Sequence, residues 1–225
     1  MKNINIKFLI SCLLVASLVT GCKKSGYLTD GGVHTAITPL SNYDYLKQHS
    51  WNSFDTLIAI IDHFNLKDEV NQAGTFFAPT DNSIARFLKF KTDSVQLINE
   101  NNKYSLADMF NQVSADSIRQ YLFVDKYSLE NTPEAVKQVV SVGKTNCGLQ
   151  KILQTGGEYY QWGSTPVYSL YFTKIRGSLD DPNAAYDPNN PDNDTRVICQ
   201  TTGILTNNGS NVLHVLANTH LFVRF

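Results

Sequence analysis

The stretch of sequence that decides the fold is Thr75-Phe76-Phe77-Ala78-Pro79-Thr80-Asp81. Threonine and phenylalanine favour extended backbone, and proline has no N–H to donate to a neighbouring strand, so we expect a strand over 75–78 that Pro79 ends. Either Thr80 or Asp81 can accept hydrogen bonds from the free N–H groups at the start of a following helix. The apolar face of that helix would consist of Ile84, Phe87 and Leu88.

Helical patterns surround this strand, and strand patterns follow them. Phe54, Leu57, Ile58 and Ile61 recur at the spacing of an amphipathic helix, and further helices are expected at 106–110 and 115–121. Beyond about residue 138 the pattern approaches period two, which predicts strands at 139–142, 149–153, 159–162, 167–175, 197–201, 204–206, 212–217 and 221–224. Because helices come first and strands later, the order indicates an α+β domain.

Two blocks of the chain resemble the signature blocks of the fasciclin family. The first is the 75–81 stretch, and the second is Thr206-Asn207-Asn208-Gly209 followed by Val212-Leu213-His214-Val215-Leu216. The resemblance covers about residues 41–225 and implies a wedge-shaped β-sandwich with helices packed on one side, enlarged by a long loop insertion around 155–195. His214 lies in the apolar run 212–216, so we expect it to be a hydrogen-bonded core residue rather than a metal ligand.

The N-terminus predicts export and a lipid anchor. Lys2 and Lys7 precede an apolar run over 8–19, and small residues lead to Cys22. This pattern is typical of a secretory signal, here 1–21, and the cysteine after Gly21 resembles a bacterial lipobox. The resemblance implies acylation of Cys22 (palmitate or similar chains) and a place in the cell envelope, at the outer membrane, with the periplasmic or surface face left open. The following residues lack periodicity, so we expect a flexible tether over 22–40. A plain signal peptide with a chance cysteine is the alternative.

Cleavage and acylation would leave two cysteines, Cys147 and Cys199, since Cys12 lies in the leader. Outside the cytoplasm, two such thiols can form a disulfide. A small buried side chain is the equally supported alternative for each of them. The sequence leaves the two interpretations open.

Several function classes are disfavoured. The chain has 19 basic and 20 acidic residues without a basic stripe, so we expect no nucleic-acid partner. Residues 141–145 end like a phosphate loop, but Gln138 stands where the first glycine belongs, which favours a turn between strands. We therefore expect no enzyme, cofactor or metal site, with a hydrolase as the minor alternative. The loop with Asp187, Asp192 and Asp194 is interpreted as hydrated, with calcium binding left open.

Binding is the function that the sequence favours. Four aromatic residues lie in one glycine-flanked region and can stack on sugar rings or anchor a protein partner: Tyr159, Tyr160, Trp162 and Tyr168. Core packing is the other interpretation for at least half of them. We expect a lipid-anchored adhesion or binding module that recognises a glycan or a protein by non-covalent contacts. The alternative is a structural or accessory subunit of an envelope complex for nutrient uptake.

Overall fold

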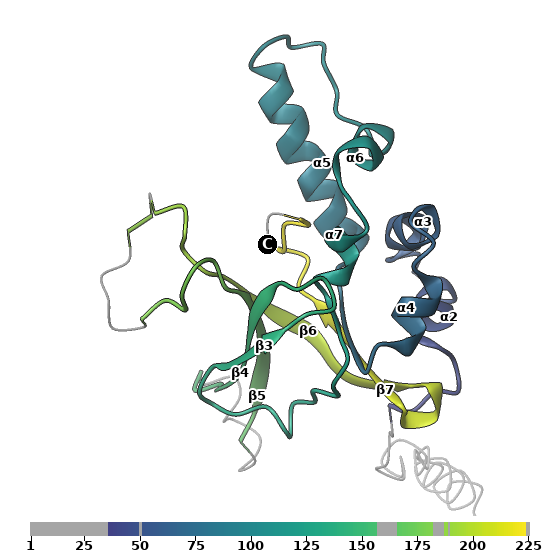
Figure 1. Ribbon diagram of the computed structural model, residues 1–225, viewed down its shortest axis with the longest axis vertical. Helices are drawn as coiled ribbons and strands as arrows, with labels where there is room; N and C mark the ends of the chain where they lie inside the picture. Colours follow the sequence, from purple (N-terminus) through teal and green to yellow (C-terminus); the bar gives the residue numbers. More distant parts are fainter. Residues whose placement is uncertain (1–35, 50, 157–165, 182–186, 189, 224–225) are drawn as a thin grey trace, which may run out of the picture. The chain divides into compact units, whose positions relative to one another are not determined.

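The computed structural model describes residues 36–49, 51–156, 166–181, 187–188 and 190–223, which form a mixed α and β unit (Figure 1). Its helices are α2 (Asn42–Lys47), α3 (Asp55–His63), α4 (Lys67–Gln72), α5 (Asp81–Gln96), α6 (Leu106–Gln112) and α7 (Asp116–Arg119). Its strands are β1 (Thr75–Ala78), β2 (Leu122–Phe123), β3 (Lys137–Val140), β4 (Asn146–Leu153), β5 (Tyr168–Lys174), β6 (Thr195–Thr206) and β7 (Asn211–Leu216). The expected α+β class is confirmed.

Some expectations lie outside the described residues. These are the leader, Cys22, most of the tether, and the predicted strand over 159–162 with Tyr159, Tyr160 and Trp162. Among the helices that the structure does describe, none is both long enough and apolar enough to cross a membrane.

The described strands join in one hydrogen-bonded sheet, in the order β2-β1-β7-β6-β5-β4-β3. The sheet curls, as the contact between two of its non-neighbouring strands shows. The Phe77 ring on β1 stacks on the Phe172 ring on β5, with 4.6 Å between centroids, although β7 and β6 lie between these strands in the sheet. The two ends of the strand order also approach each other, since the N–H of Val142, after β3, donates to the carbonyl of Leu122 on β2 at 2.8 Å. The inside of the curl is therefore a packed aromatic core.

The two blocks quoted from the sequence lie side by side. β1 is parallel to β7, so that Phe76 is the register partner of Leu213 and Phe77 that of His214. All residues of both strands are buried. The predicted strand over 75–78 is confirmed with those bounds.

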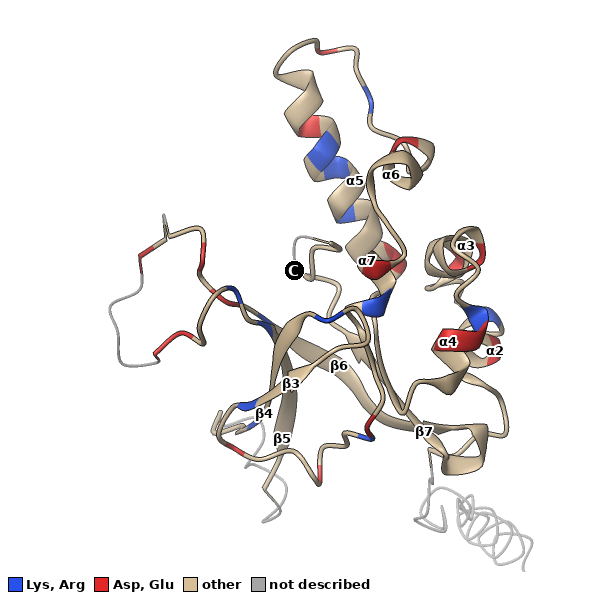
Figure 2. Ribbon diagram, viewed as in Figure 1, with Lys and Arg blue, Asp and Glu red and all other residues tan. Residues whose placement is uncertain are grey.

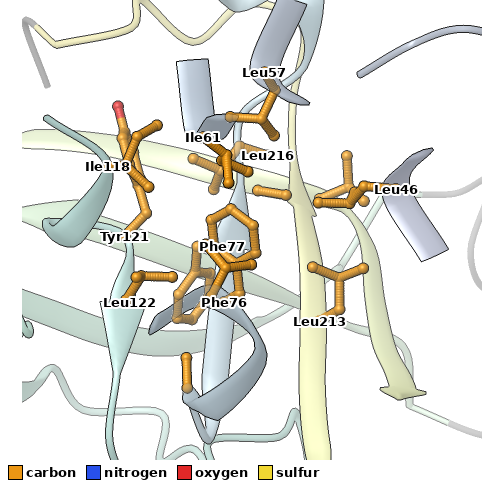
Figure 3. Close-up of a cluster of buried hydrophobic side chains, with 14 of the residues drawn as sticks. Leu46, Leu57, Ile61, Phe76, Phe77, Ile118, Tyr121, Leu122, Leu213 and Leu216 are labelled. Carbon is orange, nitrogen blue, oxygen red and sulfur yellow. The ribbon is translucent and has the colours of Figure 1, made fainter. Parts of the chain in front are cut away.

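Helices α2, α3 and α4 pack together next to these strands (Figure 1). Leu57 and Ile61 of α3 and Leu46 of α2 join Phe76 of β1 in a buried hydrophobic cluster (Figure 3). The amphipathic spacing read from residues 54–61 is therefore explained by contact with the sheet.

His214 is a satisfied core residue, as expected. Its side chain is fully buried, its Nδ1 accepts a hydrogen bond from the N–H of Gly203 at 3.2 Å, and its Nε2 lies 2.8 Å from the carbonyl oxygen of Tyr127. A carbonyl can only accept, so Nε2 has the proton and the imidazole is neutral. Burial lowers the pKa of His214 to about 4.

The strand pattern was wrong at several places. The two strands expected at 197–201 and 204–206 form one continuous strand, β6, whose pairing with β7 shifts register near Thr201. No strand forms at 221–223: the N–H of Phe222 donates to the carbonyl of Ser83, and Val223 has a positive φ of 67°. The short elements α4 and β2 were not anticipated as a separate helix and strand, because tertiary contacts define them.

The disulfide alternative is wrong for this structure, because Cys147 and Cys199 are both free and buried. Cys147 lies on β4 and Cys199 on β6, with β5 between the two strands. Two strand spacings of about 4.8 Å exceed the separation of Cα atoms that a disulfide spans. The register separates them further, since Cys147 pairs with Lys174 while Ile198, next to Cys199, pairs with Tyr171. Both thiols are therefore small core side chains.

Candidate functional site

A pocket of about 480 Å³ opens where the 75–81 block meets the end of β7. Four parts of the chain form its wall: the segment before α3, the start of α5, the register shift in β6, and the turn after β7. The segment before α3 contributes His49, Trp51, Asn52, Ser53 and Phe54. The other parts contribute Thr80, Asp81, Asn82, Gln200, Thr201, Val215 and Asn218.

Asp81 fixes the geometry of this pocket. Its two carboxylate oxygens accept hydrogen bonds from the N–H groups of Thr56 and Leu57, each at 3.0 Å. These are free N–H groups at the start of α3, whose own N-cap residue, Phe54, provides no side-chain acceptor. Asp81 therefore caps α3 across the pocket, and the charge of its carboxylate is offset by the helix dipole.

Thr80 links the turn after β7, on another side of the pocket, to the 75–81 block. Its side-chain oxygen accepts from the N–H of Ser83 and so caps α5, and its hydroxyl donates to the side-chain oxygen of Asn218 at 2.8 Å. The sequence left Thr80 and Asp81 as alternative caps of one helix. In the structure each caps a different helix, and together they hold the walls of the pocket in place.

An aromatic rim lies on the side of α3. The side chain of Trp51 is 83% exposed, although tryptophan is costly to leave in water. The His49 ring makes edge contacts with the Trp51 ring at 6.3 Å and with the buried Phe54 ring at 5.2 Å. The Nδ1 atom of His49 is buried and has no hydrogen-bond partner within the described part of the chain.

Side-chain amides and a hydroxyl lie on the remaining walls. Gln200 and Thr201 lie at the register shift in β6. Cys199 pairs with Leu216 and Thr201 with the next residue of β7, Val215, so Gln200 is the extra residue between the two pairs. The side chains of Asn82, Gln200 and Thr201 form no hydrogen bond with any residue that the structure describes. Each amide offers both donors and an acceptor, which suits hydroxyl groups on a ligand.

The wall of this pocket offers hydrogen-bonding groups and an aromatic face. The ionisable side chains in the wall are His49 and Asp81, and the Asp81 carboxylate is already engaged with two backbone N–H groups. Amides of asparagine and glutamine do not transfer protons at ordinary pH, so these side chains can donate and accept hydrogen bonds but cannot act as an acid or a base.

The site predicted from the sequence is not this pocket. Tyr168 begins β5, where its hydroxyl donates to the Glu134 carboxylate at 3.0 Å and the Lys151 ammonium lies 5.2 Å from its ring centroid. It takes no part in the wall described above. The other three aromatic residues of that prediction lie outside the described residues. The signal that was missed is Trp51, a tryptophan in a polar segment just before an amphipathic helix.

The acidic loop is held by its own backbone. The Asp194 carboxylate accepts hydrogen bonds from the N–H groups of Arg176 and Asp180, both at 2.9 Å, and the Asp180 carboxylate accepts from the N–H of Asp194 at 2.9 Å. Within the described residues, no group of three acidic, histidine or cysteine side chains is arranged to hold a metal ion. Residues 182–186 and 189 of this loop lie outside the described residues, so both interpretations of the loop, hydrated or calcium-binding, stay predictions.

In comparisons with known proteins, no family model matches the chain, and no curated protein shows significant similarity to it.

Proposed function

We propose that this protein is a lipid-anchored binding module of the cell envelope, and that the pocket beside Trp51 holds a glycan by non-covalent contacts. One observation carries the proposal: a largely exposed tryptophan stands over a pocket with unbonded side-chain amides. Sugars present hydroxyl groups at their edges and C–H groups on their faces. Such ligands match amides and an aromatic ring respectively.

A fasciclin-like fold is part of the same proposal. The two blocks that resemble the family lie on neighbouring parallel strands, with Phe77 and His214 in register, and helices pack beside them. The finer description as a wedge-shaped sandwich, and the anchor at Cys22 in the outer membrane, are proposed on the sequence pattern. A cap such as Asp81, which joins two helices, gives a physical reason for an aspartate at the end of the first block.

A glycan is favoured over a protein partner by the size and polarity of the pocket. Its volume lies within the roughly 300–1,000 Å³ of small-ligand sites, whereas a protein interface covers a broad and flatter surface. Many of its wall residues are polar, and the walls are fixed in advance by Asp81 and Thr80. A ligand would therefore meet a largely preformed site, which lowers the entropic cost of binding.

The test is retention of the full-length protein, solubilised in mild detergent, on an array of bacterial, plant and host glycans. Trp51→Ala is expected to lower affinity for the retained glycan about five- to tenfold, since stacking on an aromatic ring contributes on the order of 1–1.5 kcal/mol. Gln200→Ala is expected to lower it about fivefold. Both residues are exposed, so the free energy of unfolding should change little.

Trp162→Ala is the matched control, because it removes the only other tryptophan of the chain. Equal retention of Trp51→Ala and the parent would contradict the pocket as the site. Loss of retention in Trp162→Ala alone would instead support the aromatic region that the sequence first suggested.

An accessory-subunit function is the second candidate, and one observation favours it. Leu97 and Ile98 follow α5 at the far end from the pocket and are 90% and 88% exposed. Adjacent apolar side chains in water are typical of a protein contact. A Leu97→Asn, Ile98→Asn variant should then lose a membrane partner that co-purifies with the parent. A parent that purifies alone would contradict this candidate.

A further inference from the structure

The pocket does not end at Asn82. A second, shallower depression of about 360 Å³ lies along α5 and is lined by Asn82, Ala85, Arg86, Lys89 and Asn218. Asn82 and Asn218 line both depressions, so the two adjoin at these residues, and we call the pair the groove. Asn82, Arg86 and Lys89 stand at spacings of four and three residues, which places them on one face of the helix.

The two basic side chains of this groove, Lys89 and Arg86, differ in their ion pairing. The Lys89 ammonium is paired with the Asp93 carboxylate at 2.8 Å, whereas Arg86 forms no ion pair with any residue in the described ranges. The carboxylate of Asp81, in the wall of the first depression only, is engaged by two N–H groups at the start of α3. Arg86 is therefore the uncompensated charge of the groove. Figure 2 shows α5 with its basic residues in blue.

From this arrangement we infer that the glycan is acidic, with a carboxylate that binds Arg86 while a neighbouring ring lies at Trp51. The inference rests on the proposed function and names its ligand class. A guanidinium offers two parallel N–H groups that match both oxygens of a carboxylate. The amides of Asn82 and Asn218 lie between the two ends and are placed to bind the hydroxyl groups of a chain that runs along α5.

The experiment compares uronic-acid oligosaccharides with their carboxyl-reduced, neutral forms in calorimetry on the full-length protein. The acidic forms should bind at least about fivefold more tightly, and Arg86→Gln should remove that preference without changing affinity for the neutral forms. Arg86→Lys should restore only part of it, because lysine lacks the planar pair of donors. Affinity for the acidic forms should also fall as salt rises from 50 to about 300 mM.

Lys103→Gln is the matched control: it also removes one positive charge, but from an exposed position beyond the other end of α5. If Lys103→Gln weakens binding as much as Arg86→Gln, the preference reflects net charge and the inference is overturned. Equal affinity for acidic and neutral forms, with binding still dependent on Trp51, overturns this inference and leaves the proposed function intact. Binding of no oligosaccharide at all overturns both.

Discussion

The ring of Phe77 lies flat against the imidazole of His214, with 4.9 Å between centroids and 20° between planes. The two residues are also register partners in the parallel pair of β1 and β7. On its other face Phe77 stacks on Phe172 of β5, so the three rings cross the interior of the curled sheet. His214 is thus held by ring contacts as well as by its two hydrogen bonds to Gly203 and Tyr127.

This burial makes stability depend on pH. Burial lowers the pKa of His214 to about 4 and that of His220 to about 3, from about 6.5 in the unfolded chain. Between pH 6.5 and 4 the unfolded state therefore binds more protons than the folded state. Stability present above pH 6.5 is lost as pH falls through this window, by about 1 kcal/mol per pH unit for each histidine.

Urea unfolding at a series of pH values between 5 and 7 measures this slope. His214→Gln should lower the free energy of unfolding at pH 7, and it should reduce the slope between pH 6 and 5 by about 1 kcal/mol per unit. An unchanged slope would contradict the buried, neutral state of His214. A direct check is an NMR titration of the imidazole, for which a midpoint near 6.5 in the folded protein would be the contrary result.

The cap that Asp81 provides should be visible in stability. Asp81→Ala removes the acceptor of two N–H groups at the start of α3, so thermal or urea unfolding should show a loss of about 2 kcal/mol. The control is Asp93→Ala, which removes a carboxylate from α5, the helix that also contains Asp81. The partner of Asp93 is the exposed Lys89, so this change should cost about 0.5 kcal/mol or less. Equal losses in the two variants would show that the cap across the pocket is absent.

Gly74 should tolerate no side chain. A Cβ added there would lie 2.1 Å from the carbonyl oxygen of Val124, which Thr75 holds close through hydrogen bonds to Asp125 and Tyr127. Gly74→Ala should therefore destabilise the protein by about 3 kcal/mol, measured by urea unfolding. The control, Gly177→Ala, has a φ of +67° and open space around its Cβ, so it should cost about 1 kcal/mol. A Gly74→Ala variant as stable as the control would contradict the close approach of the two segments.

Much of the fold could be predicted from local patterns. The strand over 75–78, the helix that starts after Thr80, and the turn at Asn208, whose φ is 53°, follow from propensity, capping and turn chemistry. The arrangement of strands could not be predicted. The parallel pair of β1 and β7 joins residues about 137 positions apart, and nothing local specifies such a register.

The candidate site was missed for a similar reason. Asp81 looks like a cap of its own helix, but its carboxylate reaches back about 25 residues to Thr56. Trp51 precedes α3, Gln200 lies on β6 and Asn218 follows β7, so the three converge only when these elements are assembled. The four aromatic residues that the sequence favours are close together only along the chain. The one that the structure describes, Tyr168, donates a hydrogen bond to Glu134 and does not line the pocket.

The most direct test of the account is the fluorescence of Trp51 in a Trp162→Phe variant, where Trp51 is the only tryptophan left. Because Trp51 is 83% exposed in the free protein, a bound oligosaccharide should exclude water from its indole, shift its emission to shorter wavelength and protect it from quenching by iodide. The change should follow the same saturation curve as binding measured by calorimetry. Emission and quenching that stay unchanged at saturating ligand would contradict the claim that this pocket is the binding site.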